Sequence, residues 1–149
     1  MTGYHITLGD GRSTKELMAA AKYGYCHSQV LSDNLPARPF NGKTLREIVP
    51  LTFDRPMSSE DATAEAAKQG SARPSYEHAL YFGIKYPEAQ LETPVAFLHD
   101  PWLGNHGRRD AICLWRNEGG RELGLQGFDD LWPEHYRLAF VRPSGTDPE

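Results

Sequence analysis

The sequence predicts an α+β fold, in which an antiparallel β-sheet, drawn mostly from the C-terminal half, carries two or three packed helices. Two observations lead to this prediction. From residue 79 onward, apolar and polar residues alternate with a period of two, which is typical of strands. Before that point, two segments combine helix-capping residues with apolar residues at helical spacing. Helices packed on one face of the sheet would complete the core.

The N-terminal segment is expected to form a strand and then a helix. Residues 4–8 alternate between apolar and polar side chains and end at a Gly-Asp-Gly turn. Ser13 and Glu16 have the spacing of a capping box, in which each side chain satisfies a backbone amide of the other. A helix is therefore expected at 14–23.

The middle of the chain is rich in turn residues and contains a second helix signal. Residues 44–47 are interpreted as one helical turn that Pro50 ends, and residues 51–53 as a short strand. A helix is expected at 59–69, because a serine cap precedes two acidic residues and an alanine-rich run that ends at a glycine.

The second half is expected to form an antiparallel meander. Its candidate strands are 79–86, 94–100, 110–117, 121–127 and 136–142. Between the third and fourth of these lies Asn-Glu-Gly-Gly, whose glycines tolerate the backbone of a tight turn. A β-hairpin over 110–127 follows from this pattern.

The first strand of this hairpin is apolar on both faces. Ile112 and Leu114 are expected on one face, and Ala111, Cys113 and Trp115 on the other. A strand that is apolar on both sides belongs in the middle of a sheet. We therefore expect Leu114 and Trp115 in the core.

Length and composition indicate a single domain without a membrane span. The chain has 149 residues, of which 39% are hydrophobic and 24% charged, close to ordinary globular usage. No apolar run approaches the roughly 18 residues that a membrane-spanning helix needs. No internal repeat or low-complexity segment divides the sequence.

The cysteine content and the first residues predict a cytoplasmic protein of bacterial or viral origin. The two cysteines, Cys26 and Cys113, lie far apart and form no disulfide framework. No pattern of basic, apolar and small residues typical of a signal peptide opens the sequence. We expect two reduced thiols.

The charge distribution disfavours general nucleic-acid binding. Sixteen Lys and Arg stand against twenty Asp and Glu, which gives a net charge of -4. Nine basic and eight acidic residues in 1–75 leave the acidity to 76–149, which has seven and twelve. Phosphate neutralisation requires the opposite sign. A macromolecular partner of this half would be basic, and no membrane partner is expected.

The loop at 99–110 combines histidines, aspartates, arginines and a tryptophan. Arg108 and Arg109 could hold a phosphate or carboxylate, and Trp102 could offer a stacking face. Asn105 and His106 complete this candidate binding loop. Alternatively, the arginines pair with neighbouring aspartates at the surface and the tryptophan packs on the sheet edge.

The same loop contains residue types that bind metals. His99, Asp100, His106 and Asp110 are all metal-binding residue types. Their spacing matches no metal-site pattern, so we expect no metal and no cofactor.

The segment 128–136 mixes acidic and aromatic residues between two expected strands. Asp129 and Asp130 precede Trp132, and aromatic residues among charges are favoured at protein-contact surfaces. In the alternative interpretation, Trp132 and Leu131 anchor an ordinary loop to the core.

His5 and Thr7 lie on one face of the first expected strand, roughly 7 Å apart. This element resembles one of the two His-x-Thr/Ser motifs of the two-histidine phosphoesterases, although the chain has no second copy. Residues 4–7 and the following helix also resemble the opening of ADP-ribosyltransferase-type folds. There, such a histidine grips a nucleotide ribose and a catalytic glutamate follows. In the alternative interpretation, His5 is a hydrogen-bonded structural residue.

The resemblance implies a nucleotide- or phosphoester-handling enzyme with His5 and Thr7 in its site. Other catalytic motifs, including phosphate-binding loops, nucleophile elbows and zinc-protease helices, are absent. The acidic second half favours instead a small protein-binding or regulatory module, an inhibitor for example, that acts through its acidic-aromatic surface. Both hypotheses are retained, and neither predicts an oligomeric state.

Overall fold

The computed structural model describes residues 4–9, 11–26, 44–99, 102–103, 109–118 and 120–143. The strands in these residues are β1 (Tyr4–Leu8), β2 (Tyr25–Cys26), β3 (Thr44–Leu51), β4 (Val95–Phe97), β5 (Trp102–Leu103), β6 (Arg109–Asn117), β7 (Gly120–Gly127) and β8 (Arg137–Pro143). The helices are α1 (Thr14–Ala21), α2 (Ser59–Lys68), α3 (Tyr76–Lys85) and α4 (Ala89–Glu92). The fold is therefore α+β.

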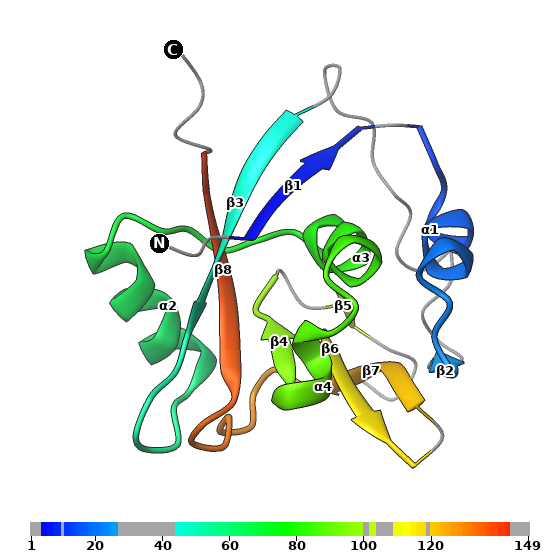
Figure 1. The fold of residues 1–149 in the computed structure, drawn as a ribbon. Helices are drawn as coiled ribbons and strands as arrows, with labels where there is room; N and C mark the ends of the chain where they lie inside the picture. The colour runs from blue at the N-terminus through cyan, green and yellow to red at the C-terminus, as the bar shows by residue number, and fades with distance from the viewer. Residues whose placement is uncertain are drawn as a thin grey trace.

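The described strands form one mixed sheet (Figure 1). Their order is β1-β3-β8-β4-β6-β7-β2, and β5 pairs with β6 beside this path. The β4–β8 and β2–β7 pairs are parallel, while the others are antiparallel. The prediction of a purely antiparallel meander is thus wrong. The chain leaves β7 and returns to the middle of the sheet, and local alternation does not specify such a distant neighbour.

Helices cover both faces of the sheet, not one as predicted. We call the side covered by α1, α3 and α4 the α3 face, because these helices and the sheet share one buried cluster. The opposite side, covered by α2, is the α2 face and has its own cluster. Both faces of the central strands are consequently buried, which suits their apolar composition.

The first helix forms as its capping residues predict. The Glu16 amide donates to the Ser13 hydroxyl at 3.1 Å, and the Ser13 amide donates to the Glu16 carboxylate at 2.8 Å. Helix α1 ends at Ala21, and Lys22 caps it in the left-handed conformation with φ of 57°. Helix α2, capped by the Ser58 side chain, likewise matches the expected segment within one residue. None of the helices in the described residues is long and apolar enough to cross a membrane.

Two segments adopt the opposite structure to the one predicted. Residues 79–86 were expected as a strand but mostly belong to α3, which begins at Tyr76 after a Ser75–His78 capping box. All residues from Glu77 to Gly83 are buried, so the helix shows no polar stripe that would reveal its period. Residues 44–47, expected as a helical turn, lie in β3, which pairs with β1 and β8 on its two sides.

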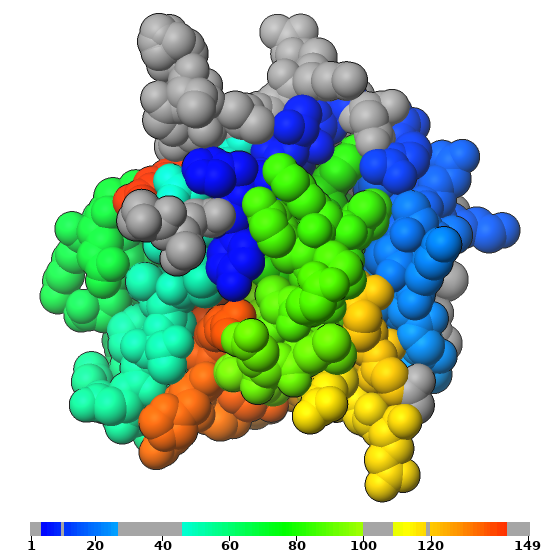
Figure 2. Space-filling model, viewed as in Figure 1, coloured from blue at the N-terminus to red at the C-terminus, as the bar shows by residue number. Residues whose placement is uncertain are grey.

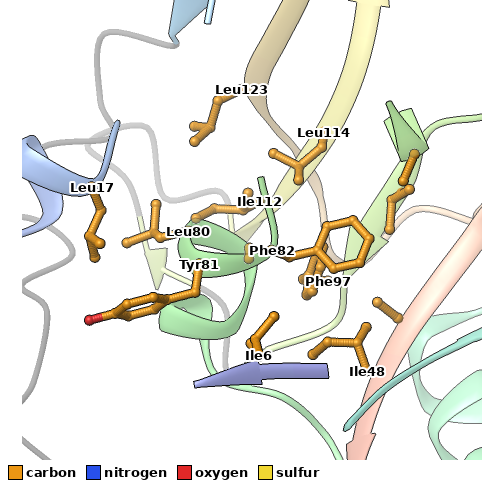
Figure 3. Close-up of a cluster of buried hydrophobic side chains, with 14 of the residues drawn as sticks. Ile6, Leu17, Ile48, Leu80, Tyr81, Phe82, Phe97, Ile112, Leu114 and Leu123 are labelled. Atoms are coloured by element: carbon orange, nitrogen blue, oxygen red, sulfur yellow. The ribbon is translucent and has the colours of Figure 1, made fainter. Parts of the chain in front are cut away.

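The central hairpin is confirmed in both position and orientation. Strands β6 and β7 pair from Asp110 opposite Gly127 to Asn117 opposite Gly120. Ile112 and Leu114 join the cluster of the α3 face, which Figure 3 shows together with Phe82 and Phe97. Ala111 and Cys113 join the cluster of the α2 face, and Trp115 packs at its margin, half-buried.

A partly buried arginine on β7 connects the α3-face helices to the sheet. The Arg121 guanidinium donates to the carbonyl oxygens of Ala21 at 2.5 Å and Gly83 at 2.6 Å, near the ends of α1 and α3. It also lies 4.6 Å from the ring centroid of Tyr23. From α4, the Gln90 amide donates to the Glu122 carbonyl of β7 at 3.0 Å. These contacts fix three helices relative to one hairpin.

We predict that Leu114→Ala lowers the free energy of unfolding by about 2–5 kcal/mol, because Leu114 is completely buried in a central strand. Leu131→Ala is the matched control, since Leu131 is 63% exposed and should cost less than about 0.5 kcal/mol. Urea denaturation measures both. A loss below about 0.5 kcal/mol for Leu114→Ala would contradict the position of β6.

A second prediction concerns the contact of α3 with Tyr23. A Cβ atom added to Gly83 would lie 1.8 Å from the Tyr23 hydroxyl oxygen. We expect Gly83→Ala to destabilise the protein by about 1–3 kcal/mol. Among the described residues the buried Tyr23 hydroxyl has no hydrogen-bond partner, so Tyr23→Phe should cost under about 1 kcal/mol and relieve part of the clash. A double-mutant cycle tests this coupling, and strictly additive effects would count against it.

Candidate functional site

The segment expected to form an acidic-aromatic surface lies beside the start of α2. Met57 and Trp132 exchange backbone hydrogen bonds of 3.1 and 2.7 Å. The His135 amide donates to the Phe53 carbonyl at 3.2 Å. Residues 128–136 and 53–61 therefore form one braced double loop on the α2 face.

The tryptophan of this segment is not exposed, contrary to the acidic-aromatic hypothesis. Trp132 is 3% exposed, and its indole nitrogen donates to the Ser59 hydroxyl at 2.8 Å. The Ser59 hydroxyl in turn donates to the Phe128 carbonyl at 2.6 Å. Because the Ser59 hydroxyl accepts the hydrogen bond of the indole nitrogen, the Trp132 ring can be buried completely. Trp132 holds the loop in place, as the alternative interpretation expected, while Leu131 points outward, 63% exposed.

Asp129 is paired within the protein. The Arg109 Nε donates to the Asp129 carboxylate at 3.0 Å, and a second guanidinium nitrogen contacts its other oxygen. This hydrogen bonding lowers the pKa of Asp129 and raises the pKa of Arg109, which Glu60 also raises. The Arg109 guanidinium additionally lies 5.3 Å from the Phe128 ring centroid. Arg109 thus meets an internal carboxylate, and an external anion would compete with it.

Other acidic side chains of the double loop are exposed. Asp130 forms no ion pair within the described residues. Glu60 and Asp61 occupy the first turn of α2. Glu134 is about half exposed, and its carboxylate lies 3.3 Å from the imidazole nitrogen of the adjacent His135. We define the acidic loop surface as Glu60, Asp61, Asp130, Leu131 and Glu134.

Most of the candidate binding loop at 99–110 lies outside the described residues. This applies to Asn105, His106 and Arg108, as well as to the metal candidate Asp100. The Trp102 backbone pairs with Asp110 in the β5–β6 ladder. His99 is completely buried, and its Nε2 accepts a hydrogen bond from the Ile112 amide at 2.9 Å. Across the described part of the chain, no group of three metal-ligating side chains is assembled.

His5 and Thr7 lie on the α2 face of β1, because Ile6 and Leu8 between and after them are buried in the cluster of the opposite face. Cross-strand pairing places Glu47 directly opposite His5 and Arg142 directly opposite Glu47. A row of three charged or titratable groups therefore crosses β1, β3 and β8.

Glu47 is the best-anchored member of this row. The Arg142 guanidinium donates to its carboxylate at 2.9 and 3.4 Å, and the Glu47 side chain is 13% exposed. Hydrogen bonding to Arg142 lowers the pKa of Glu47, with a smaller contribution from His5. Sequence reasoning missed Glu47 because residues 44–47 were interpreted as helical. The apolar Ile48 and Val49 that follow are the signal that favoured a strand.

The backbone of His5 is held from outside the sheet. Its amide donates to the Tyr86 hydroxyl at 2.9 Å, and its carbonyl accepts from Tyr86 at 3.1 Å and from Lys85 at 2.6 Å. These bonds cover the outer edge of β1, which would otherwise be open to strand pairing. They also fix the position from which the imidazole projects.

A groove of about 350 Å³ adjoins this row. It is lined by Tyr4, Glu47, Ile48, Val49, Pro50, Arg137 and Arg142. Neither His5 nor Thr7 belongs to its lining. An enzyme site of the kind that the first strand resembles would require the histidine, the hydroxyl and a glutamate in one concave site. Here the glutamate lies beside His5, but the concave space lies beyond it.

Comparisons with protein families, curated proteins and solved structures find no match to this chain. Functional inference therefore depends on the geometry of the residues themselves.

We predict that Glu47→Gln removes a pH-dependent contribution to stability. A carboxylate whose folded-state pKa is lowered stabilises the fold above its usual pKa of about 4.3. This contribution is lost as the pH falls from there through the folded-state pKa. Wild type should therefore exceed the variant in stability at neutral pH, and the difference should shrink in acid. Urea melts across this range measure it, with exposed Glu88→Gln as control; a pH-independent difference would contradict the linkage.

Proposed function

We propose that this protein is a docking module that binds a basic partner protein through the acidic loop surface. The observation that carries the proposal is Leu131, which is 63% exposed beside exposed Asp130 while the next residue, Trp132, is 3% exposed. An apolar side chain held outward by a buried neighbour is preorganised for contact. Preorganisation lowers the entropy lost on binding.

Charge supports a basic partner. The acidic loop surface combines four carboxylates with one exposed leucine. Exposed charges at the edge of an interface attract an oppositely charged partner and accelerate association, whereas an apolar residue near the centre supplies more of the affinity. Asp129 contributes less than the sequence suggested, because Arg109 already neutralises it.

The structure of the double loop also suits a binding role. Its two segments are joined by the backbone hydrogen bonds between Met57 and Trp132 and by the side-chain hydrogen bonds of Ser59. A loop anchored in this way keeps its shape when its exposed residues are substituted. The surface can therefore be tested without unfolding the protein.

A second candidate is an enzyme that handles a nucleotide or phosphoester with His5 and Thr7. The observation in its favour is the position of Glu47 opposite His5, which also contributes to lowering the pKa of Glu47. A carboxylate beside an imidazole can orient it for proton transfer. We rank this candidate second, because the adjoining groove is not lined by His5 or Thr7.

The test compares charge and apolar substitutions on the acidic loop surface. Asp130→Lys should slow association with a lysine- and arginine-rich peptide by about tenfold at low salt, and much less at high salt, where charges are screened. Leu131→Ala should increase the dissociation rate without changing the salt dependence. Surface plasmon resonance measures both rates.

The control is Glu88→Lys, which makes the same charge change at an exposed position before α4, on the opposite face. Equal losses in Asp130→Lys and Glu88→Lys would reduce the interaction to net charge and refute a specific surface. His5→Ala should leave binding intact. If His5→Ala instead abolished hydrolysis of a nucleotide or phosphodiester substrate, the enzyme hypothesis would replace the docking one.

A further inference from the structure

A second groove lies at the opposite end of the β6–β7 hairpin from the acidic loop surface. Its volume is about 420 Å³, and it is lined by Gly24, Tyr25, Asn117, Glu118 and Glu122. Figure 1 shows β2 along the outer edge of β7, near the hairpin turn. In Figure 2, the blue segment that carries β2 borders the yellow and gold hairpin at this edge. The lining of this groove therefore includes one aromatic ring and two carboxylates.

The ring of Tyr25 is unusually accessible for an aromatic residue in a strand. It is 54% exposed, one of only three large hydrophobic side chains that are exposed among the described residues. Parallel pairing of β2 with β7 places Tyr25 beside Glu122. The ring and this carboxylate therefore lie on the same face of the sheet edge.

Glu122 is held in a defined orientation. The Trp115 indole nitrogen donates to its Oε1 atom from the neighbouring strand. The Gln90 amide holds the Trp115 and Glu122 carbonyls at 2.6 and 3.0 Å. The Gly24 amide donates to the Arg121 carbonyl at 2.8 Å and keeps β2 against β7. Within the described residues, the second oxygen of the Glu122 carboxylate accepts no hydrogen bond, so it can accept one from an external donor.

The nearby arginines are placed on the other face. Arg116 and Arg121 are cross-strand partners, and Arg121 reaches the carbonyls of α1 and α3. Glu122 follows Arg121 directly in β7 and projects to the opposite side. None of the five described residues that line the groove is basic, and two of them are carboxylates.

We propose that this groove binds the guanidinium group of an arginine side chain presented by a peptide or protein. A planar guanidinium can stack on the Tyr25 ring and donate to Glu122 and Glu118 at the same time. Lysine offers the charge without the planar fork and should bind more weakly. The groove lies a full hairpin length from the acidic loop surface, so its ligand binding does not depend on the proposed docking function.

The probe is N-acetyl-arginine-N-methylamide, with the norleucine analogue as the uncharged control and the lysine analogue as the ammonium control. NMR titration follows the Trp115 indole signal, because this group is bonded to Glu122. We expect saturable shifts with a dissociation constant of about 1–10 mM for the arginine probe. A ten-residue peptide with one central arginine should bind at least as tightly if the natural ligand is a peptide, whereas weaker binding of this peptide would indicate a free guanidinium compound.

Three variants test the residues. Glu122→Gln keeps an acceptor for the Trp115 indole, so the fold is retained while binding weakens at least fivefold. Tyr25→Ala should weaken binding similarly, whereas Tyr25→Phe should preserve it. Glu134→Gln, in the acidic loop surface, is the control and should have no effect.

The proposal is overturned if the norleucine probe shifts the Trp115 signal as strongly as the arginine probe does. It is also overturned if Glu122→Gln and Tyr25→Ala bind the arginine probe like wild type. Exposed Glu118→Gln provides a further check that does not touch the indole contact. If Asp130→Lys loses binding of the lysine- and arginine-rich peptide but binds the arginine probe like wild type, the two sites are independent.

Discussion

The contacts of Arg121 determine where the α3-face helices sit. Other side chains cannot easily replace Arg121, because its guanidinium donates from a strand of the sheet to backbone carbonyls near the ends of two helices. Such carbonyls carry the negative end of the helix dipole, so a cation is stabilised there. Burying this charge would be costly without these partners. The Tyr23 ring, 4.6 Å from the guanidinium, completes the enclosure.

This arrangement also separates the charges of the β6–β7 hairpin. Alternation along β7 sends Arg121 to the α3 face and Glu122 to the α2 face. The Arg121 guanidinium donates to helix carbonyls. The adjacent Glu122 carboxylate lies at the edge groove, where it accepts a hydrogen bond from the Trp115 indole. One strand therefore provides both a structural anchor and a candidate ligand group. Substitution of Arg121 would disturb the groove indirectly, through the position of β2.

Sequence reasoning succeeded where the signal is local. The Ser13–Glu16 capping box and the glycine-rich turn of the hairpin each specify their own backbone, and both are confirmed. It failed for α3, because seven consecutive buried residues remove the polar positions that distinguish a helix from a strand. The strand expected at 136–142 matches β8, but its parallel pairing with β4 was missed, because that pairing depends on residues far away in the chain.

In the candidate sites too, the residue types could be predicted from the local sequence, but the contacts between distant residues could not. The acidic residues at 129–130 were recognisable from composition, but the burial of Trp132 depends on a hydroxyl from α2, 73 positions earlier in the chain. Glu47 could not be paired with His5 while residues 44–47 were interpreted as helical. Most of the candidate binding loop lies outside the described residues, so Asn105, His106 and Arg108 stay predictions.

The two proposed binding sites are connected by the geometry of one hairpin. Strand β6 begins at Arg109, which bonds to Asp129 beside the acidic loop surface, and ends at Asn117, which lines the edge groove. Nine residues of extended chain span about 30 Å. A peptide of fewer than about eight residues held at one site cannot span this distance, whereas a folded basic protein can contact both sites. Simultaneous contact would raise affinity through effective concentration, without any conformational change in this protein.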